Sequence, residues 1–180
     1  MNATYFLIDT IFGLYLMAVL LRFWLQIARA DFYNPFSQFV VKVTNPLLIP
    51  LRKVVPGLFG LDMASIVLAL LIALLKIVAI LLLSTGSIDN PLMLILPSVV
   101  IVVKEALNII FWIMVIRALL SWVSQGQSPM DAVLFQLTEP LLRPIRKVLP
   151  SMGGIDLSVL VFLISIQFIN LLLVDMFGRI

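Results

Sequence analysis

The side chains most able to do chemistry in this sequence are charged and amide groups inside long apolar segments. A charge within a membrane is costly, so it is normally paired or used to move ions or protons. Asp9 and Lys76 lie at similar depths of their segments, and we predict that they pair. We expect the acids and lysines of this intramembrane polar layer to neutralise one another. Its other members are Lys104, Glu105, Asn108, Gln167 and Asn170.

A second group of candidates is an Arg-Lys pair that occurs twice, as Arg52-Lys53 and Arg146-Lys147, which we call the basic elbows. Each pair lies in a polar connection, within a PLLxPxRKVxP stretch. Because prolines break the hydrogen-bond ladder of a helix, we predict a rigid path with no continuous helix. Fixed basic groups of this kind can dock anionic lipid head groups or an acidic partner surface. The alternative is that they only orient the chain in the membrane.

Composition excludes most other kinds of chemistry. The 180 residues are 63% hydrophobic and 12% charged, whereas soluble proteins are roughly 45–50% apolar and about 25% charged. The sequence has no Cys and no His, the commonest ligands of transition metals, and His is also the commonest general base. A net charge of +3 gives no basic surface typical of nucleic-acid binding. We therefore expect no enzyme, no cofactor or metal, and no nucleic-acid partner.

Four apolar segments have the length of about 20 residues that a membrane helix needs. They lie at about 5–25, 63–83, 99–122 and 157–174. The stretch 91–98 before the third segment is either interfacial or part of that span. The sequence thus predicts an all-α membrane protein with four transmembrane helices.

The chain repeats itself at an offset of 94 residues. Residues 44–62 and 138–156 are identical at 11 of 19 positions. We therefore interpret the chain as two copies of one module, 1–90 and 91–180, each with a helix, a connection and a helix. Because an even number of spans separates equivalent points, the two copies are expected to be parallel rather than inverted.

Each connection contains the pattern of a short amphipathic helix. Asn34-Pro35 and Ser128-Pro129 combine a good N-cap with proline at the first helical position. We expect these helices to lie in the membrane interface, the alternative being that they pack against the helix bundle. Asp62 and Asp156 are predicted N-caps of the second and fourth spans. The apolar stripes are Phe36, Phe39, Val40 and Val43, and Met130, Val133, Leu134 and Leu137.

The basic residues predict how the chain is oriented. Nine of the 12 Lys and Arg residues flank the two connections. By the positive-inside rule the connections are cytoplasmic, so both termini and the turn at 84–90 face outward. Arg22 and Arg117 then lie near the inner ends of their spans, where we expect them to reach the interface as anchors.

Together these segments resemble the YggT family of small bacterial inner-membrane proteins, which is similar to membrane proteins of chloroplasts and cyanobacteria. The resemblance lies in both PLLxPxRKVxP blocks, in NPFSQFVVKVTNP and in SWVSQGQSP. It implies the bacterial inner (cytoplasmic) membrane, with links to osmotic stress and potassium homeostasis. In plastids it implies assembly of electron-transfer complexes. It supplies no catalytic residues.

Two functions follow from these features. The first is a scaffold, assembly or stress-response factor that binds anionic lipid or a membrane protein complex through the basic elbows. The alternative is a protein of ion transport or of potassium and osmotic homeostasis that uses the intramembrane polar layer. Because four spans are few for a permeation route, the alternative requires a homo-oligomer.

Overall fold

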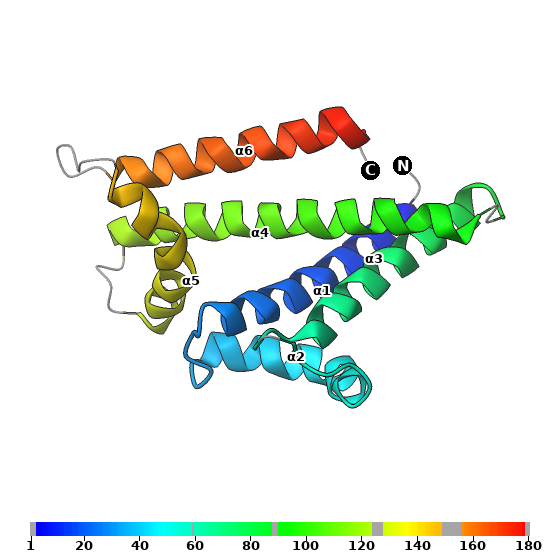
Figure 1. Ribbon diagram of the computed structural model, residues 1–180, viewed down its shortest axis with the longest axis horizontal. Helices are drawn as coiled ribbons and strands as arrows, with labels where there is room; N and C mark the ends of the chain where they lie inside the picture. The colour runs from blue at the N-terminus through cyan, green and yellow to red at the C-terminus, as the bar shows by residue number, and fades with distance from the viewer. Residues whose placement is uncertain (1–2, 59, 88–89, 124–127, 149–155, 179–180) are drawn as a thin grey trace.

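The computed structural model describes residues 3–58, 60–87, 90–123, 128–148 and 156–178, which fold into helices and the turns between them (Figure 1). The helices are α1 (Ala3–Ile27), α2 (Pro35–Arg52), α3 (Met63–Ser84), the short 3-10 helix η1 (Pro91–Leu94), α4 (Ile95–Val123), α5 (Pro129–Arg146) and α6 (Leu157–Phe177).

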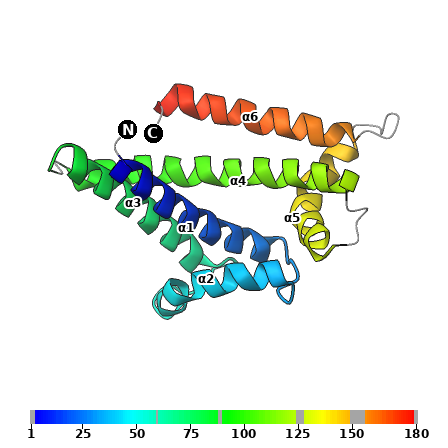
Figure 2. The ribbon, with the colours of Figure 1, turned by 180° about the vertical axis from the view of Figure 1, so that it is seen from behind.

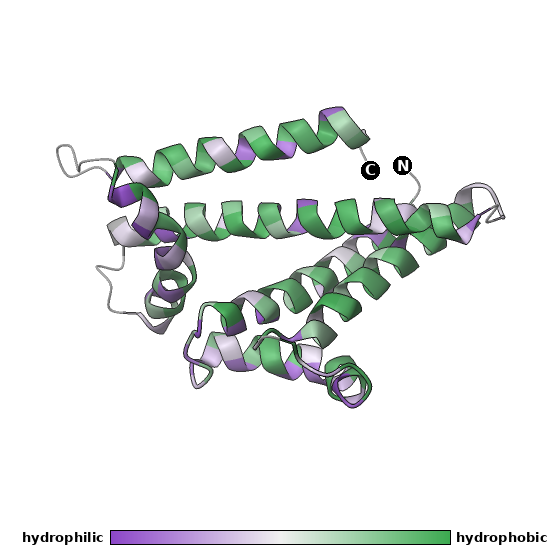
Figure 3. Cartoon of the chain, viewed as in Figure 1, coloured by the Kyte–Doolittle hydropathy of each residue, from purple (hydrophilic) through white to green (hydrophobic). Residues whose placement is uncertain are grey.

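Four of these helices, α1, α3, α4 and α6, are long and apolar enough to cross a membrane. In the most apolar window of each, between 11% and 22% of the residues are buried inside the protein. The rest of each window is at least partly exposed, and the long helices are hydrophobic over most of their length (Figure 3), as expected when the surrounding solvent is lipid. The stretch 91–98 is divided, because η1 ends at Leu94 and α4 begins at Ile95. The candidate third span nevertheless includes the whole stretch, because it runs from Pro91 to Ser121.

The long helices form two neighbouring pairs. α1 packs beside α3 and α4 packs beside α6, while α4 also contacts α1 and α3. The start of α1 and the end of α6 lie near each other, α5 lies at the opposite end of α4, and α2 lies along the lower edge beneath α1 (Figures 1 and 2). The side of α3 that is buried carries small residues, including Ala64, Ala69 and Ala73, which let helices approach closely.

Three of the four predicted helix starts are confirmed by side-chain caps, whereas Asp62 stands at the N-cap position of α3 but its side chain makes no capping hydrogen bond, because Arg52 and the Ser65 hydroxyl occupy it. The Asn34 side chain accepts a hydrogen bond from the amide of Phe36 at 3.0 Å. Ser128 and Asp131 form a capping box, in which each side chain bonds the other residue's amide. Asp156 caps α6 by accepting the amide of Ser158 at 3.1 Å.

The prediction that prolines prevent a continuous helix is wrong. α2 continues through Pro46 and Pro50, and α5 continues through Pro140 and Pro144. All four prolines are exposed. Because the prolines of each helix are four residues apart, they remove donors along one outer face, where the freed carbonyls can bond water or lipid head groups. The basic elbows are consequently the last turns of helices.

The connection helices pack inward and also leave apolar residues outside. Val40 in α2 and Leu134 in α5 are buried in one cluster with residues of α1 and α4. Phe39, from the predicted stripe of α2, is instead 65% exposed, and Phe135 of α5 is 51% exposed. Packing against the bundle, one of the two alternatives for these helices, therefore accounts for their buried face.

Candidate functional site

A cluster of polar residues joins α1, α2 and the start of α3. Arg22 of α1 is 7% exposed, and its Nη1 donates to the Thr44 hydroxyl of α2 at 3.3 Å. Arg52, the last residue of α2, binds Asp62 through Nη2 and Oδ2 at 2.5 Å. Asp62 in turn accepts the Ser65 hydroxyl at 2.6 Å. We call Arg22, Thr44, Arg52 and Asp62 the first arginine cluster.

The same arrangement recurs in the second half of the chain, at an offset of 95 residues for the arginine of the long helix and 94 for the other three residues. Arg117 of α4 donates to the Thr138 hydroxyl of α5, and Arg146 binds Asp156 at 2.5 Å. We call Arg117, Thr138, Arg146 and Asp156 the second arginine cluster. In both copies an arginine from the first long helix is held against the connection helix. An arginine at the end of that connection helix then binds the residue before the next long helix.

Arg22 was expected to extend into the interface as an anchor, but its side chain is buried inside the protein. Its side chain is held against the fully buried Thr44, whose own hydroxyl donates to the carbonyl of Val40 at 2.8 Å. Arg117 is less enclosed, with a side chain 17% exposed. These arginines therefore connect the long helices to the connection helices.

The two clusters differ by one negative charge. In the second cluster, Glu139 accepts Arg117 Nη2 at 3.3 Å and Arg146 Nη1 at 2.9 Å. The equivalent position of the first cluster is Asn45. The first cluster thus has two arginines and one carboxylate, whereas the second has two arginines and two carboxylates.

The ion pairs shift the ionisation of the residues that form them. Burial raises the pKa of Asp62, but the hydrogen bonds from Arg52 and Ser65 outweigh it, so that the net pKa is lowered. The pKa of Asp156 is lowered in the same way, with Ser158 and Arg146 as the donors. Burial lowers the pKa of Arg146, but its bonds to Asp156 and its attraction to Glu139 raise it overall.

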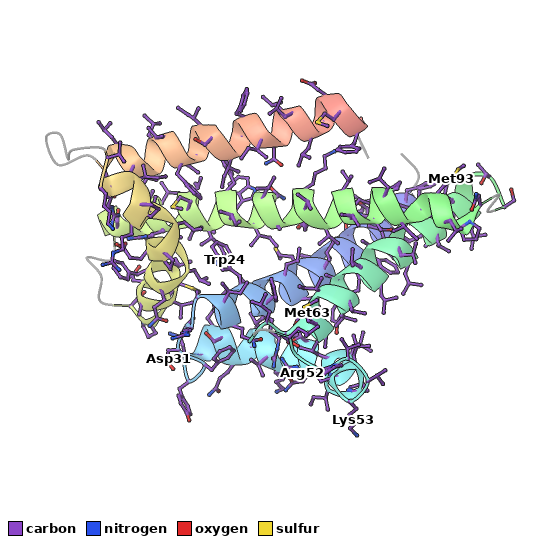
Figure 4. The ribbon with its side chains drawn as sticks, viewed as in Figure 1. Trp24, Asp31, Arg52, Lys53, Met63 and Met93 are labelled. Atoms are coloured by element: carbon purple, nitrogen blue, oxygen red, sulfur yellow. The ribbon has the colours of Figure 1, made fainter. Side chains whose placement is uncertain are left out.

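The basic elbows divide into two kinds of residue. Their arginines are committed to ion pairs with Asp62 and Asp156, ten residues ahead in the chain. Their lysines, Lys53 and Lys147, are exposed. Figure 4 shows Lys53 projecting away from the end of α2, with Arg52 nearer to the start of α3. The sequence contained this signal, because an aspartate follows each elbow arginine at the same distance.

In the intramembrane polar layer, the pair expected between Asp9 and Lys76 is present. Lys76 Nζ lies 2.6 Å from Asp9 Oδ1, with the lysine side chain 16% exposed and the aspartate side chain 59% exposed. Glu105 of α4 interacts electrostatically with both residues, and its side chain hydrogen-bonds that of Asn108. Three long helices thus place ionised groups at one level.

The expected neutralisation of this layer by two lysines is wrong. Lys104 does not point the same way as its neighbour Glu105. Its Nζ donates to the carbonyl of Gly178 at 3.0 Å. A cation there stabilises the C-terminal end of α6. The layer around Lys76 therefore holds two carboxylates and one ammonium group. Gln167 and Asn170 lie on α6, the first exposed and the second half-buried.

A cavity of about 500 Å³ lies between α1, α3 and α4. Its lining is apolar apart from Ser65, and it includes Trp24, Ile66 and Ile110. A space of this character suits a lipid acyl chain or another apolar group better than a hydrated ion.

Comparison with known proteins decides the family. The family model described as CCB3/YggT matches residues 1–83 and 96–177, one stretch in each half of the chain. The chain belongs to the CCB3/YggT family. The resemblance inferred from the sequence is thereby confirmed.

Relatives in the CCB3/YggT family extend over nearly the whole chain. An uncharacterized protein of Vibrio alginolyticus, from the proC 3′ region, is 49% identical over 100% of this chain and 98% of its own length. The uncharacterized protein YggT of Escherichia coli K12 is 45% identical over 95% of this chain and 89% of its own. An uncharacterized Pseudomonas aeruginosa protein is 43% identical over 97% of this chain and 89% of its own. No solved structure matches the chain.

Proposed function

We propose that the protein is a scaffold, assembly or stress-response factor of the bacterial inner membrane. In this proposal its two modules are parallel and its connections lie on the cytoplasmic side. There, α2 and α5 rest in the membrane interface, and the elbows bind anionic lipid or a partner membrane complex. Function depends on holding a surface in place rather than on a reaction.

The observation that carries this proposal is a set of exposed basic side chains on the two connections. They lie beside exposed apolar residues such as Phe39 and Phe135, which suit the acyl boundary of a membrane. Basic groups next to the membrane surface attract anionic lipids, by about 1 kcal/mol for each Lys or Arg. Besides Arg52 and Arg146, which are exposed but held in ion pairs, the exposed basic residues are Arg29, Lys42, Lys53, Arg143 and Lys147.

The ion pairs make the test sharper. Because Arg52 and Arg146 hold Asp62 and Asp156, their removal would damage the fold, whereas Lys53 and Lys147 can be changed with little structural effect. The variant is Lys53→Gln with Lys147→Gln. The matched control is Lys53→Arg with Lys147→Arg, which keeps both charges.

The measurement is the amount of phosphatidylglycerol and partner protein that copurifies with each variant. At low salt the Gln variant should retain less than the parent and the Arg variant as much. The difference should shrink at high salt, because the screening length falls from about 30 Å at about 0.01 M salt to about 3 Å at about 1 M. If a correctly inserted Gln variant retains the same lipids and proteins as the parent, the proposal is wrong.

The second candidate function, ion transport by a homo-oligomer, is favoured by one observation. Asp9 and Glu105 face the single ammonium group of Lys76, and a pair of carboxylates with incomplete compensation is a feature of cation and proton pathways. Ion flux into vesicles containing the purified protein tests it. Flux that Glu105→Gln abolishes would favour transport over the scaffold function.

A further inference from the structure

We propose that the first arginine cluster binds one phosphate group, held where the Glu139 carboxylate lies in the second cluster. The second cluster contains its own anion on the chain, and the first lacks it. The inference that this phosphate belongs to a lipid head group rests on the proposed function. The site itself is argued from the two clusters alone.

The first observation is an incompletely bonded buried charge. Arg22 is 7% exposed, and among the described residues its Nε has no hydrogen-bond partner. Buried polar groups are nearly always hydrogen-bonded, and a buried charge without compensation is strongly destabilising. Thr44 satisfies one amine of the guanidinium but brings no charge, and the attraction of Asp62 for Arg22 is opposed by the repulsion of Arg52. An external anion would supply both the acceptor and the counter-charge.

The second observation is the position of Asn45. Glu139 reaches Arg146 seven residues ahead, which is two turns along the same face of α5. Asn45 stands seven residues before Arg52 on α2 and next to Thr44. A carboxylate at residue 45 would therefore lie between Arg22 and Arg52. The amide that occupies this position leaves that place without a negative charge.

The third observation is space beside Arg22. Two open cavities, of about 610 Å³ and about 770 Å³, are each lined by Arg22 and Phe32. The first also has Arg52, its ion-pair partner Asp62 and Gln26 in its wall, and the second has Lys42 and Asn45. Arginine forks and amide groups match the several acceptor oxygens of phosphate. The cavities are large enough for a head group.

The cavities also indicate which phosphate is bound. The first lies by the ends of α1 and α2 and the second along the first half of α2, on the side of the proposed membrane interface, and Tyr33 and Phe39 add aromatic walls to the second. Aromatic side chains are enriched at head-group level. A phospholipid can place its phosphate on Arg22 and Arg52 while its chains stay in the bilayer. We therefore infer a lipid phosphodiester rather than free phosphate.

The test compares Asn45→Glu with Asn45→Gln in the full-length protein in detergent, because the two side chains have the same size and differ in charge. Native mass spectrometry measures the affinity for added phosphatidylglycerol. The Glu variant should bind the first lipid about ten-fold or more weakly, since it has filled the site, and the Gln variant should bind like the parent. Equal binding by all three proteins would overturn the site.

Thermal unfolding gives a second measurement on the same proteins. Phosphatidylglycerol should raise the Tm of the parent and of Asn45→Gln, but not that of Asn45→Glu. Without lipid, Asn45→Glu should be more stable than the parent, because its carboxylate compensates Arg22 internally. A loss of stability in lipid-free Asn45→Glu, or a Tm shift equal to the parent's, contradicts the proposal.

A variant that creates a second phosphate site, in the second arginine cluster, tests the inference if Asn45→Glu does not fold. Glu139→Gln removes the internal anion from Arg117 and Arg146, so this variant should bind one more phosphatidylglycerol than the parent. An unchanged number of bound lipids counts against the site.

Inorganic phosphate is the probe that separates the two sources. Tm shifts from phosphate equal to those from lipid would support the site and refute its lipid source. The proposed function can fail without affecting either result of the phosphate experiment, because it is tested with variants of Lys53 and Lys147, which lie outside the site.

Discussion

The ion pair between Asp9 and Lys76 predicts an asymmetric response to mutation. Replacing Lys76 with Met leaves two carboxylates, Asp9 and Glu105, at one level of the bundle. When Asp9 is replaced with Asn, Lys76 still interacts with the carboxylate of Glu105. Because only the first change creates an uncompensated like-charge pair, Lys76→Met should destabilise the protein more than Asp9→Asn.

The magnitude follows from the distance and the exposure. At 2.6 Å and an effective dielectric constant of about 20, the attraction is about 6 kcal/mol before desolvation is subtracted. Loss of one partner from a buried pair costs about 3–5 kcal/mol, but the Asp9 side chain is 59% exposed. We expect Lys76→Met to cost about 2–3 kcal/mol and Asp9→Asn about 1 kcal/mol, with a coupling energy of about 1–2 kcal/mol.

The assay is reversible unfolding of the parent, the two single variants and the double variant in mixed micelles. Lys104→Met provides a matched control, because Lys104 is an intramembrane lysine that bonds Gly178 instead of Asp9. Its coupling to Asp9→Asn should be within about 0.5 kcal/mol of zero. Additive effects of Asp9→Asn and Lys76→Met, or equal costs of the two single changes, would refute the reasoning.

Three further predictions concern the turns, the caps and the orientation. Arg29 has a φ of 50°, a left-handed conformation at the end of α1, so Arg29→Gly should raise stability by about 1 kcal/mol in thermal unfolding while Arg29→Ala gives no gain. The pKa values of Asp62 and Asp156 are lowered on folding, so their contribution is complete above the unfolded value of about 3.9 and is lost as pH falls through the folded value. The destabilisation caused by Asp62→Asn and Asp156→Asn at pH 7 should therefore diminish in unfolding measured at pH 3. A C-terminal reporter that works only outside the cytoplasm should be active, and activity of a cytoplasm-only reporter there would contradict the orientation.

The sequence predicted the long helices well because their apolar lengths leave few alternatives. The caps at Asn34 and Ser128 were also predictable, since the N-cap residue and the following proline act locally. The continuation of α2 through Pro46 and Pro50 was not predictable from propensity. Helix propensity counts one lost hydrogen bond against each proline. It does not consider that all four prolines are exposed, where water or lipid head groups can bond the freed carbonyls.

The site was predicted in part, because pairing depends on direction as well as depth. Depth along the spans was enough to place Asp9 with Lys76. It was not enough for Lys104 and Glu105, which are adjacent and therefore point about 100° apart around α4. Arg22 was assigned to the interface from its depth alone. Its contact with Thr44 depends on how α2 folds back against α1, which no local pattern of α1 contains.

The two halves differ in how the charges of their arginine clusters are compensated. In the second half, Glu139 completes the arginine cluster and Lys104 supports the end of α6, so Arg117, Arg146 and Lys104 have partners within the chain. In the first half, the arginine cluster has Asn45 where its equivalent has a carboxylate. Both halves keep the Arg-Thr contact and the Arg-Asp pair that define the turn, so these contacts serve the fold. The missing carboxylate is a change at a position the fold does not need, and it concentrates uncompensated positive charge beside two cavities at one place on the molecule.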